Sequence, residues 1–99
     1  MRIIARRTLR EFWDQRSHRD AEQPLRAWFA EVTRAAWRTP ADIKAAYRNA
    51  SFVGGDRVVF NIGGNKYRLV VAVKYSAQLV FVRCIGTHAE YDDIDTGEV

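Results

Sequence analysis

The stretch RVVFNI-GGN-KYRLVVAVKY-SAQ-LVFVRCI, residues 57–85, decides the fold of this 99-residue chain. It holds three runs rich in Val and aromatic residues, which favour β-strands. The three runs are residues 57–62, 66–75 and 79–85. Gly63-Gly64-Asn65 supplies the positive φ angles that a tight hairpin needs, and Ser76-Ala77-Gln78 makes the second turn. The stretch therefore predicts a three-stranded antiparallel meander.

Side chains alternate between the two faces of a strand, so the middle run has two distinct faces. One is apolar and is expected to pack on helices: Tyr67, Leu69, Val71, Val73 and Tyr75. The other carries Arg68, Val70, Ala72 and Lys74. Its cations stand about 20 Å apart at ~3.3 Å per residue. This face predicts a shallow, positively charged floor.

Helix signals precede the meander, after a short apolar run at residues 2–5 that predicts a strand. Thr8 and Glu11 have capping-box spacing and predict a helix over residues 9–17. Asp20 is expected to cap a second helix, with Pro24 in its first turn, that runs to about Trp37.

Two further capping signals complete the pattern. Thr39-Pro40 predicts a third helix that ends near residues 48–49. Thr87 and Glu90 form a capping box that predicts a short terminal helix. The fold expected is α+β: a short N-terminal strand, two to three helices on one face of a three-stranded meander, and a C-terminal helix. Residues 1–99 are expected to form one domain, with Trp13, Trp28 and Trp37 in its core.

Charge is unevenly distributed along the chain. Sixteen Lys and Arg face twelve Asp and Glu, and five of the acids fall within residues 90–99. Thirteen of the sixteen cations are Arg, which binds phosphate in a bidentate fork and stacks on bases. The basic body therefore favours a polyanionic partner such as RNA. The acidic residues 90–99 could fold across the basic surface as an internal phosphate mimic.

Composition excludes several classes of protein. Twelve aromatic residues argue against disorder, and no apolar run approaches the ~20 residues that span a bilayer. The single cysteine, Cys84, cannot form an internal disulfide, and no Cys/His cluster has zinc-ligand spacing. We expect a cytoplasmic protein without metal or cofactor.

Four residues of the second half suit metal-independent cleavage of RNA. An imidazole and a phenol, His88 and Tyr91, can transfer the protons of 2′-hydroxyl attack, and their assignment as base and acid stays open. Arg68 and Arg83 are expected to converge with them and neutralise the phosphorane. Further RNA-binding cations are expected at Lys74, Lys66 and Arg57.

The segments FNIGGNKYRLV (residues 60–70), Val82-Arg83 and GTHAEYD (residues 86–92) resemble the HigB-type toxins of the RelE superfamily. The resemblance covers nearly the whole chain. It implies a RelE-like fold and cleavage of mRNA on the translating ribosome, with Arg68, Arg83, His88 and Tyr91 as site residues. It also implies a cognate antitoxin, often of helix-turn-helix type, and we expect the free toxin to be monomeric.

Two other functions fit the same basic surface. A non-catalytic RNA- or ribosome-binding module needs the cations and aromatic rings but no proton transfer. A small protein-interaction domain could use the basic face for an acidic partner.

Overall fold

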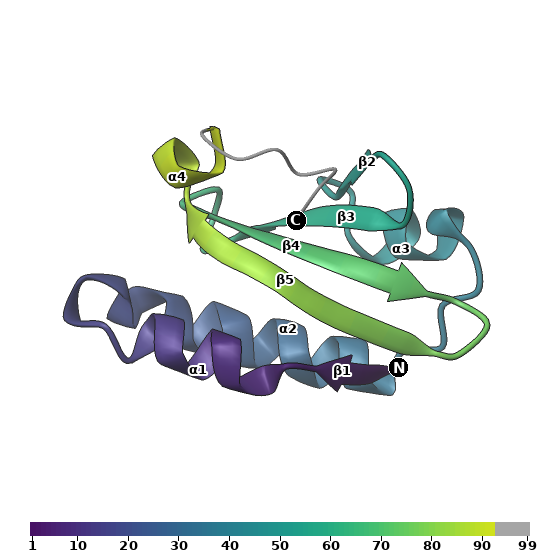
Figure 1. The fold of residues 1–99 in the computed structure, drawn as a ribbon, viewed down its shortest axis with the longest axis horizontal. Helices are drawn as coiled ribbons and strands as arrows, with labels where there is room; N and C mark the ends of the chain where they lie inside the picture. Colours follow the sequence, from purple (N-terminus) through teal and green to yellow (C-terminus); the bar gives the residue numbers. More distant parts are fainter. Residues whose placement is uncertain (93–99) are drawn as a thin grey trace.

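The computed structural model describes residues 1–92. The elements are β1 (Arg2–Ile4), α1 (Arg6–Trp13), the 3-10 helix η1 (Arg16–Ala21), α2 (Glu22–Arg34), α3 (Pro40–Ala46), β2 (Ser51–Val53), β3 (Arg57–Ile62), β4 (Tyr67–Lys74), β5 (Leu79–Thr87) and α4 (His88–Asp92). The strands form one sheet in the order β1-β5-β4-β3-β2. Figure 1 shows α1 and α2 along one side of the sheet and α4 at the far end of β5. This arrangement confirms the predicted α+β class.

The predicted meander is present as β3, β4 and β5, which pair antiparallel. Its first turn has φ of 64° at Gly63, 61° at Gly64 and 90° at Asn65, as the hairpin prediction required. β1 is a strand as predicted and pairs in parallel with β5. The sequence did not predict β2, which pairs antiparallel with β3. This three-residue strand is too short to carry an alternating pattern of its own.

The first helix begins earlier than predicted. Ala5 is its N-cap and makes no side-chain capping bond, while Thr8 lies inside the helix. Glu11 accepts a hydrogen bond from Arg7 Nε at 3.3 Å. The capping box predicted at Thr8 is therefore wrong, because the helix already extends through this position and Glu11 has an ion-pair partner one turn back.

The second helix is shorter than predicted. α2 begins at Glu22, with Pro24 in its first turn as expected, and Asp20 lies in η1, where it caps nothing. The helix ends at Arg34 because Ala35 turns into extended backbone, with φ of −76° and ψ of 156°. Trp37 lies beyond that end.

The two remaining capping predictions are confirmed. Asp42 N donates to Thr39 Oγ1 at 3.4 Å, and Thr39 N donates to the Asp42 carboxylate at 3.2 Å. The helix that follows ends at Ala46, earlier than predicted. At α4, Thr87 N donates to Glu90 Oε1 at 3.0 Å and Glu90 N donates to Thr87 Oγ1 at 3.3 Å. Each such cap stabilises its helix by about 1 kcal/mol.

The core lies between the sheet and the helices. The predicted apolar face of β4 is buried there with Leu25, Trp28 and Val32 of α2. Burial of each large apolar side chain contributes about 1.5–3 kcal/mol. The three tryptophans are core residues as predicted, with exposed fractions of 2–6%. Within residues 1–92, every helix is too short or too polar to cross a membrane.

Candidate active site

A β-bulge interrupts β5 beside the site. The pairing of β4 with β5 passes from Val70–Cys84 to Val71–Val82 and skips Arg83. A bulge of this kind turns the side chains that follow it onto the opposite face. Cys84 is therefore aligned with Val70, on the face of β4 that also carries Arg68.

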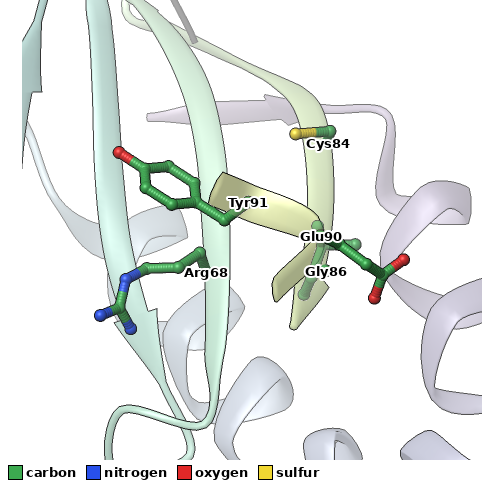
Figure 2. A pocket seen from close by; sticks show the side chains of 6 residues that line it. Arg68, Cys84, Gly86, Glu90 and Tyr91 are labelled. Carbon is green, nitrogen blue, oxygen red and sulfur yellow. The ribbon is translucent and has the colours of Figure 1, made fainter. Parts of the chain in front are cut away.

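One pocket of about 200 Å³ opens on that face. Its walls come from β4, β5 and α4: Arg68, Cys84, Ile85, Gly86, Glu90 and Tyr91. In Figure 2 the Arg68 and Tyr91 side chains both extend to the left, with the Tyr91 hydroxyl above and the Arg68 guanidinium below, while the Glu90 carboxylate points to the right. Arg68 and Tyr91 thus line one pocket, and that they act together on one phosphate stays a prediction.

The Arg68 side chain is half-buried and oriented by backbone carbonyls. Its Nη1 lies 3.3 Å from the oxygen of Asn65 and 3.5 Å from that of Tyr67. A guanidinium has five N–H donors, so these contacts leave donors for a ligand. The side chain can hold a phosphate without first breaking an ion pair, since the described residues provide no carboxylate bonded to it.

The position of Tyr91 depends on how α4 packs against β5. The Thr87–Glu90 capping box ties the first turn of α4 to the strand. Hydrogen bonding to Thr87 lowers the pKa of Glu90, and the bond from the Thr87 backbone contributes more than the Thr87 side chain. Gly86 lies opposite Arg68 in the sheet. A Cβ on Gly86 would lie 3.1 Å from Glu90 Cβ, closer than side chains normally approach. The glycine therefore allows α4 to lie directly on the strand.

Arg83 and His88 lie outside this pocket. Arg83 is exposed, with its guanidinium 5.4 Å from the centre of the Phe81 ring. It lines a second, open hollow of about 320 Å³ beside α1. The two hollows share Cys84 and Ile85, so they adjoin along β5. His88 is the exposed first residue of α4. Of the four side chains predicted to converge, Arg68 and Tyr91 therefore line the first pocket, and Arg83 and His88 do not.

The three cations predicted to bind RNA each contact a carboxylate. Lys66 pairs with Asp20, while Lys74 and Arg57 pair with Asp56. The hydrogen bond from Lys74 is the main reason that the pKa of Asp56 is lowered. Asp56 is held at this end of β4 by its own carbonyl, which accepts from Val73 N at 2.9 Å.

The shallow, positively charged floor predicted from Arg68 to Lys74 is not continuous. Val70 and Ala72, which lie between these cations, are fully buried. The two cations also have different surroundings, because Lys74 is ion-paired with Asp56 and Arg68 lines the pocket. The acidic-tail hypothesis for residues 90–99 falls largely on residues 93–99, which lie outside the described part of the chain.

Sequence reasoning missed two features near the site. Cys84 lines the pocket, where burial raises the pKa of its thiol. His18 stacks on Phe12, with ring centres 4.1 Å apart. Neighbouring residues in the sequence predict neither feature. The place of Cys84 depends on the β-bulge, and the stacking of His18 depends on how η1 packs against α1. Within residues 1–92 no three His, Cys, Asp or Glu side chains are grouped as metal ligands.

Comparisons with known proteins agree with this architecture. Residues 21–94 match the HigB toxin family, described as the RelE-like toxic component of a toxin–antitoxin system. The mRNA interferase toxin HigB of Escherichia coli K12 is 29% identical over 94 residues, which cover 93% of this chain and 88% of the relative. Proteins named mRNA interferase HigB from Escherichia coli O157:H7 and Shigella flexneri match to the same extent. The resemblance stated on the FNIGGNKYRLV and GTHAEYD segments is thereby confirmed, and the chain belongs to the HigB family of RelE-like toxins of toxin–antitoxin systems.

Proposed function

We propose that this toxin is an mRNA interferase, an endoribonuclease that cleaves mRNA on the translating ribosome. The observation that supports the proposal is the pocket that both Arg68 and Tyr91 line. Membership of the HigB family and the names of the relatives support the same activity.

The proposed reaction is attack of a ribose 2′-hydroxyl on the adjacent phosphate. The 2′-oxygen bonds to phosphorus, the bond to the 5′-oxygen breaks, and the products are a 2′,3′-cyclic phosphate and a 5′-hydroxyl. Arg68 holds the non-bridging oxygens, where negative charge grows in the transition state. Tyr91 transfers one of the two protons. The chemistry is balanced by the removal of one proton and the delivery of another, with no metal required.

His88 and Arg83 have supporting roles in this proposal. His88 begins the five-residue helix that carries Tyr91, so a bound nucleotide that covers α4 can meet both side chains. We assign His88 as the second proton-transfer group. Arg83 lies across β5 in the adjoining hollow, where it is placed to hold a flanking phosphate rather than the scissile one.

The remaining cations are proposed to bind the RNA backbone outside the pocket. The side chains of Lys66 and Lys74 are about half-exposed in their ion pairs, and exposed ion pairs are weak. An RNA phosphate can therefore exchange for the Asp56 carboxylate at Lys74, while Lys66 can bind a phosphate with the donors that its contact with Asp20 leaves free. Arg57 contributes to the same surface.

The toxin–antitoxin family implies a cognate antitoxin. We propose that it is a helix-turn-helix protein and that the free toxin is a cytoplasmic monomer.

Cleavage of ribosome-bound mRNA tests the proposal. Purified protein, programmed ribosomes and a defined transcript should give new ends that carry 2′,3′-cyclic or 3′-phosphate and 5′-hydroxyl groups. The Arg68→Ala, Tyr91→Phe double variant should lack this activity while keeping a wild-type circular dichroism spectrum. Intact transcript in the wild-type reaction, together with salt-dependent RNA binding, would instead favour a non-catalytic RNA-binding module.

A further inference from the structure

A carboxylate far from the pocket in sequence is bonded to the residues that precede Arg68. Asp20 of η1 accepts a hydrogen bond from Lys66 Nζ and another from the Tyr67 hydroxyl. These two bonds, with that from Lys66 the stronger influence, lower the pKa of Asp20, so the group is a carboxylate at neutral pH. One side chain of the helical layer thus anchors the start of β4.

The Tyr67 ring is fixed on the same layer. It packs edge-on against Phe12, with ring centres 5.3 Å apart, and against His18 at 5.7 Å. Phe12 and His18 are themselves stacked, at 4.1 Å and an interplanar angle of 9°. The Tyr67 side chain is 1% exposed. Its ring and hydroxyl therefore hold its backbone in one position.

The segment that Asp20 anchors is also the segment that orients the guanidinium. Arg68 Nη1 approaches the carbonyl oxygens of Asn65 and Tyr67, which flank Lys66. A displacement of this turn moves both acceptors and so moves the guanidinium within the pocket. The contacts form a continuous path from Asp20, through Lys66 and Tyr67, to Arg68.

We infer that Asp20 is a positioning residue for Arg68, acting through Lys66 and Tyr67 without contacting RNA in the pocket. The inference rests on the proposed function for its catalytic consequence. A guanidinium displaced by 1 Å can lose up to about a hundredfold in rate, although such a shift leaves the core intact. An ion pair as exposed as Asp20–Lys66 contributes little to folding stability. Loss of Asp20 also removes the acceptor of the nearly buried Tyr67, so some stability is lost as well, and turnover is therefore compared per folded molecule.

Three substitutions separate the contacts. Asp20→Ala removes both acceptor oxygens and should lower kcat for ribosome-bound mRNA about tenfold, with KM little changed. Asp20→Asn keeps an oxygen that accepts from Tyr67 and should restore most of kcat. Tyr67→Phe removes one of the two bonds and should fall between them. Asp14→Ala, which removes another exposed carboxylate of the helical layer, is the matched control and should match the wild type.

The double variant Asp20→Ala, Arg68→Ala tests most directly whether Asp20 acts through Arg68. Asp20→Ala should have no further effect on kcat when Arg68 is already Ala, because both changes remove the same interaction. A general structural defect would instead reduce the residual activity again, by the full tenfold. Multiplicative losses would overturn the inference.

A measurement on the free protein tests the same inference without cleavage. The Nε–Hε resonance of Arg68 in a ¹H–¹⁵N spectrum should shift in Asp20→Ala, return toward its wild-type position in Asp20→Asn, and stay in place in Asp14→Ala. An unmoved resonance in Asp20→Ala would show that Asp20 does not position Arg68. If the wild type fails to cleave mRNA, the proposed function fails, and this resonance still decides whether the positioning contact exists.

Discussion

Gly86 of β5 and Glu90 of α4 lie so close that a single methyl group at Gly86 would come within 3.1 Å of Glu90 Cβ. Gly86 is also the residue opposite Arg68 in the β4–β5 pairing. The contact therefore sets the distance between the helix that carries Tyr91 and the strand that carries Arg68. It links the packing of α4 to the geometry of the pocket.

Gly86→Ala should push α4 away from β5 and enlarge the separation of Arg68 and Tyr91. We expect at least a tenfold loss of mRNA cleavage, and a loss of about 1–3 kcal/mol in the free energy of unfolding from overpacking. Gly54→Ala is the matched control, because a Cβ at Gly54 has no atom within 4 Å and the backbone there needs no positive φ. Equal activity of the two alanine variants would contradict this role for Gly86.

Acid should weaken the folded state through the carboxyl groups whose pKa is lowered, which include Asp20, Asp42, Asp56 and Glu90. Hydrogen bonds lower the pKa of Asp20 and Asp56 below 3.8 and that of Glu90 below 4.5. A group whose folded-state pKa is depressed stabilises the fold fully above its unfolded value, and that stability is lost as pH falls through the folded value. Urea unfolding should therefore show stability that is constant near pH 6 and falls below about pH 4.5.

The variant Asp20→Asn, Asp56→Asn, Glu90→Gln removes three of these titrations. Its free energy of unfolding should decline less steeply between pH 5 and pH 3 than that of the wild type, since fewer protons are taken up on unfolding. Parallel curves for the two proteins would contradict the assignment.

The two lysines outside the pocket should contribute to RNA binding through charge alone. Lys66→Ala and Lys74→Ala should each weaken binding of a single-stranded RNA of any sequence and reduce the slope of log K against log salt by about 0.7. Fluorescence anisotropy at several salt concentrations measures this slope. Lys44→Ala, on α3, is the control, since this ammonium is bonded to the Ala50 carbonyl. Slopes that match the control would exclude these lysines from the RNA surface.

Substitutions in the hydrophobic core should change the stability of the protein and not its catalysis. Leu25 is fully buried, so Leu25→Ala should lower the free energy of unfolding by about 2–5 kcal/mol. Phe52 is 43% exposed, and Phe52→Ala should cost less than about 1 kcal/mol. Cleavage per folded molecule should be unchanged in both. A larger loss for Phe52 than for Leu25 in urea unfolding would contradict the assigned core.

Features encoded within a few residues were predicted well from the sequence. The Gly63-Gly64-Asn65 turn, the apolar face of β4 and the caps at Thr39 and Thr87 each depend on neighbours along the chain. The Thr8 prediction failed although its spacing was equally good, because capping needs the helix to begin at that residue and it begins at Arg6.

Features that depend on distant parts of the chain could not be predicted. The bulge that leaves Arg83 unpaired between Val82 and Cys84 is a property of the β4–β5 pairing, and no single strand contains it. Asp20 reads as a helix cap in sequence, and its bonds to Lys66 and Tyr67 exist only once η1 lies against the hairpin. Grouping of Arg68 with Tyr91 was predictable because the β5–α4 junction is local and β4 is adjacent.

Single-turnover cleavage by the Arg68→Ala, Tyr91→Phe and double variants tests the central claim most directly, namely that these two side chains act on one phosphodiester. The claim predicts that each single change slows cleavage of ribosome-bound mRNA by at least about a hundredfold, and that the double variant is little slower than the slower single variant. Cleavage near the wild-type rate by either single variant would contradict the claim and move the active site elsewhere on the molecule.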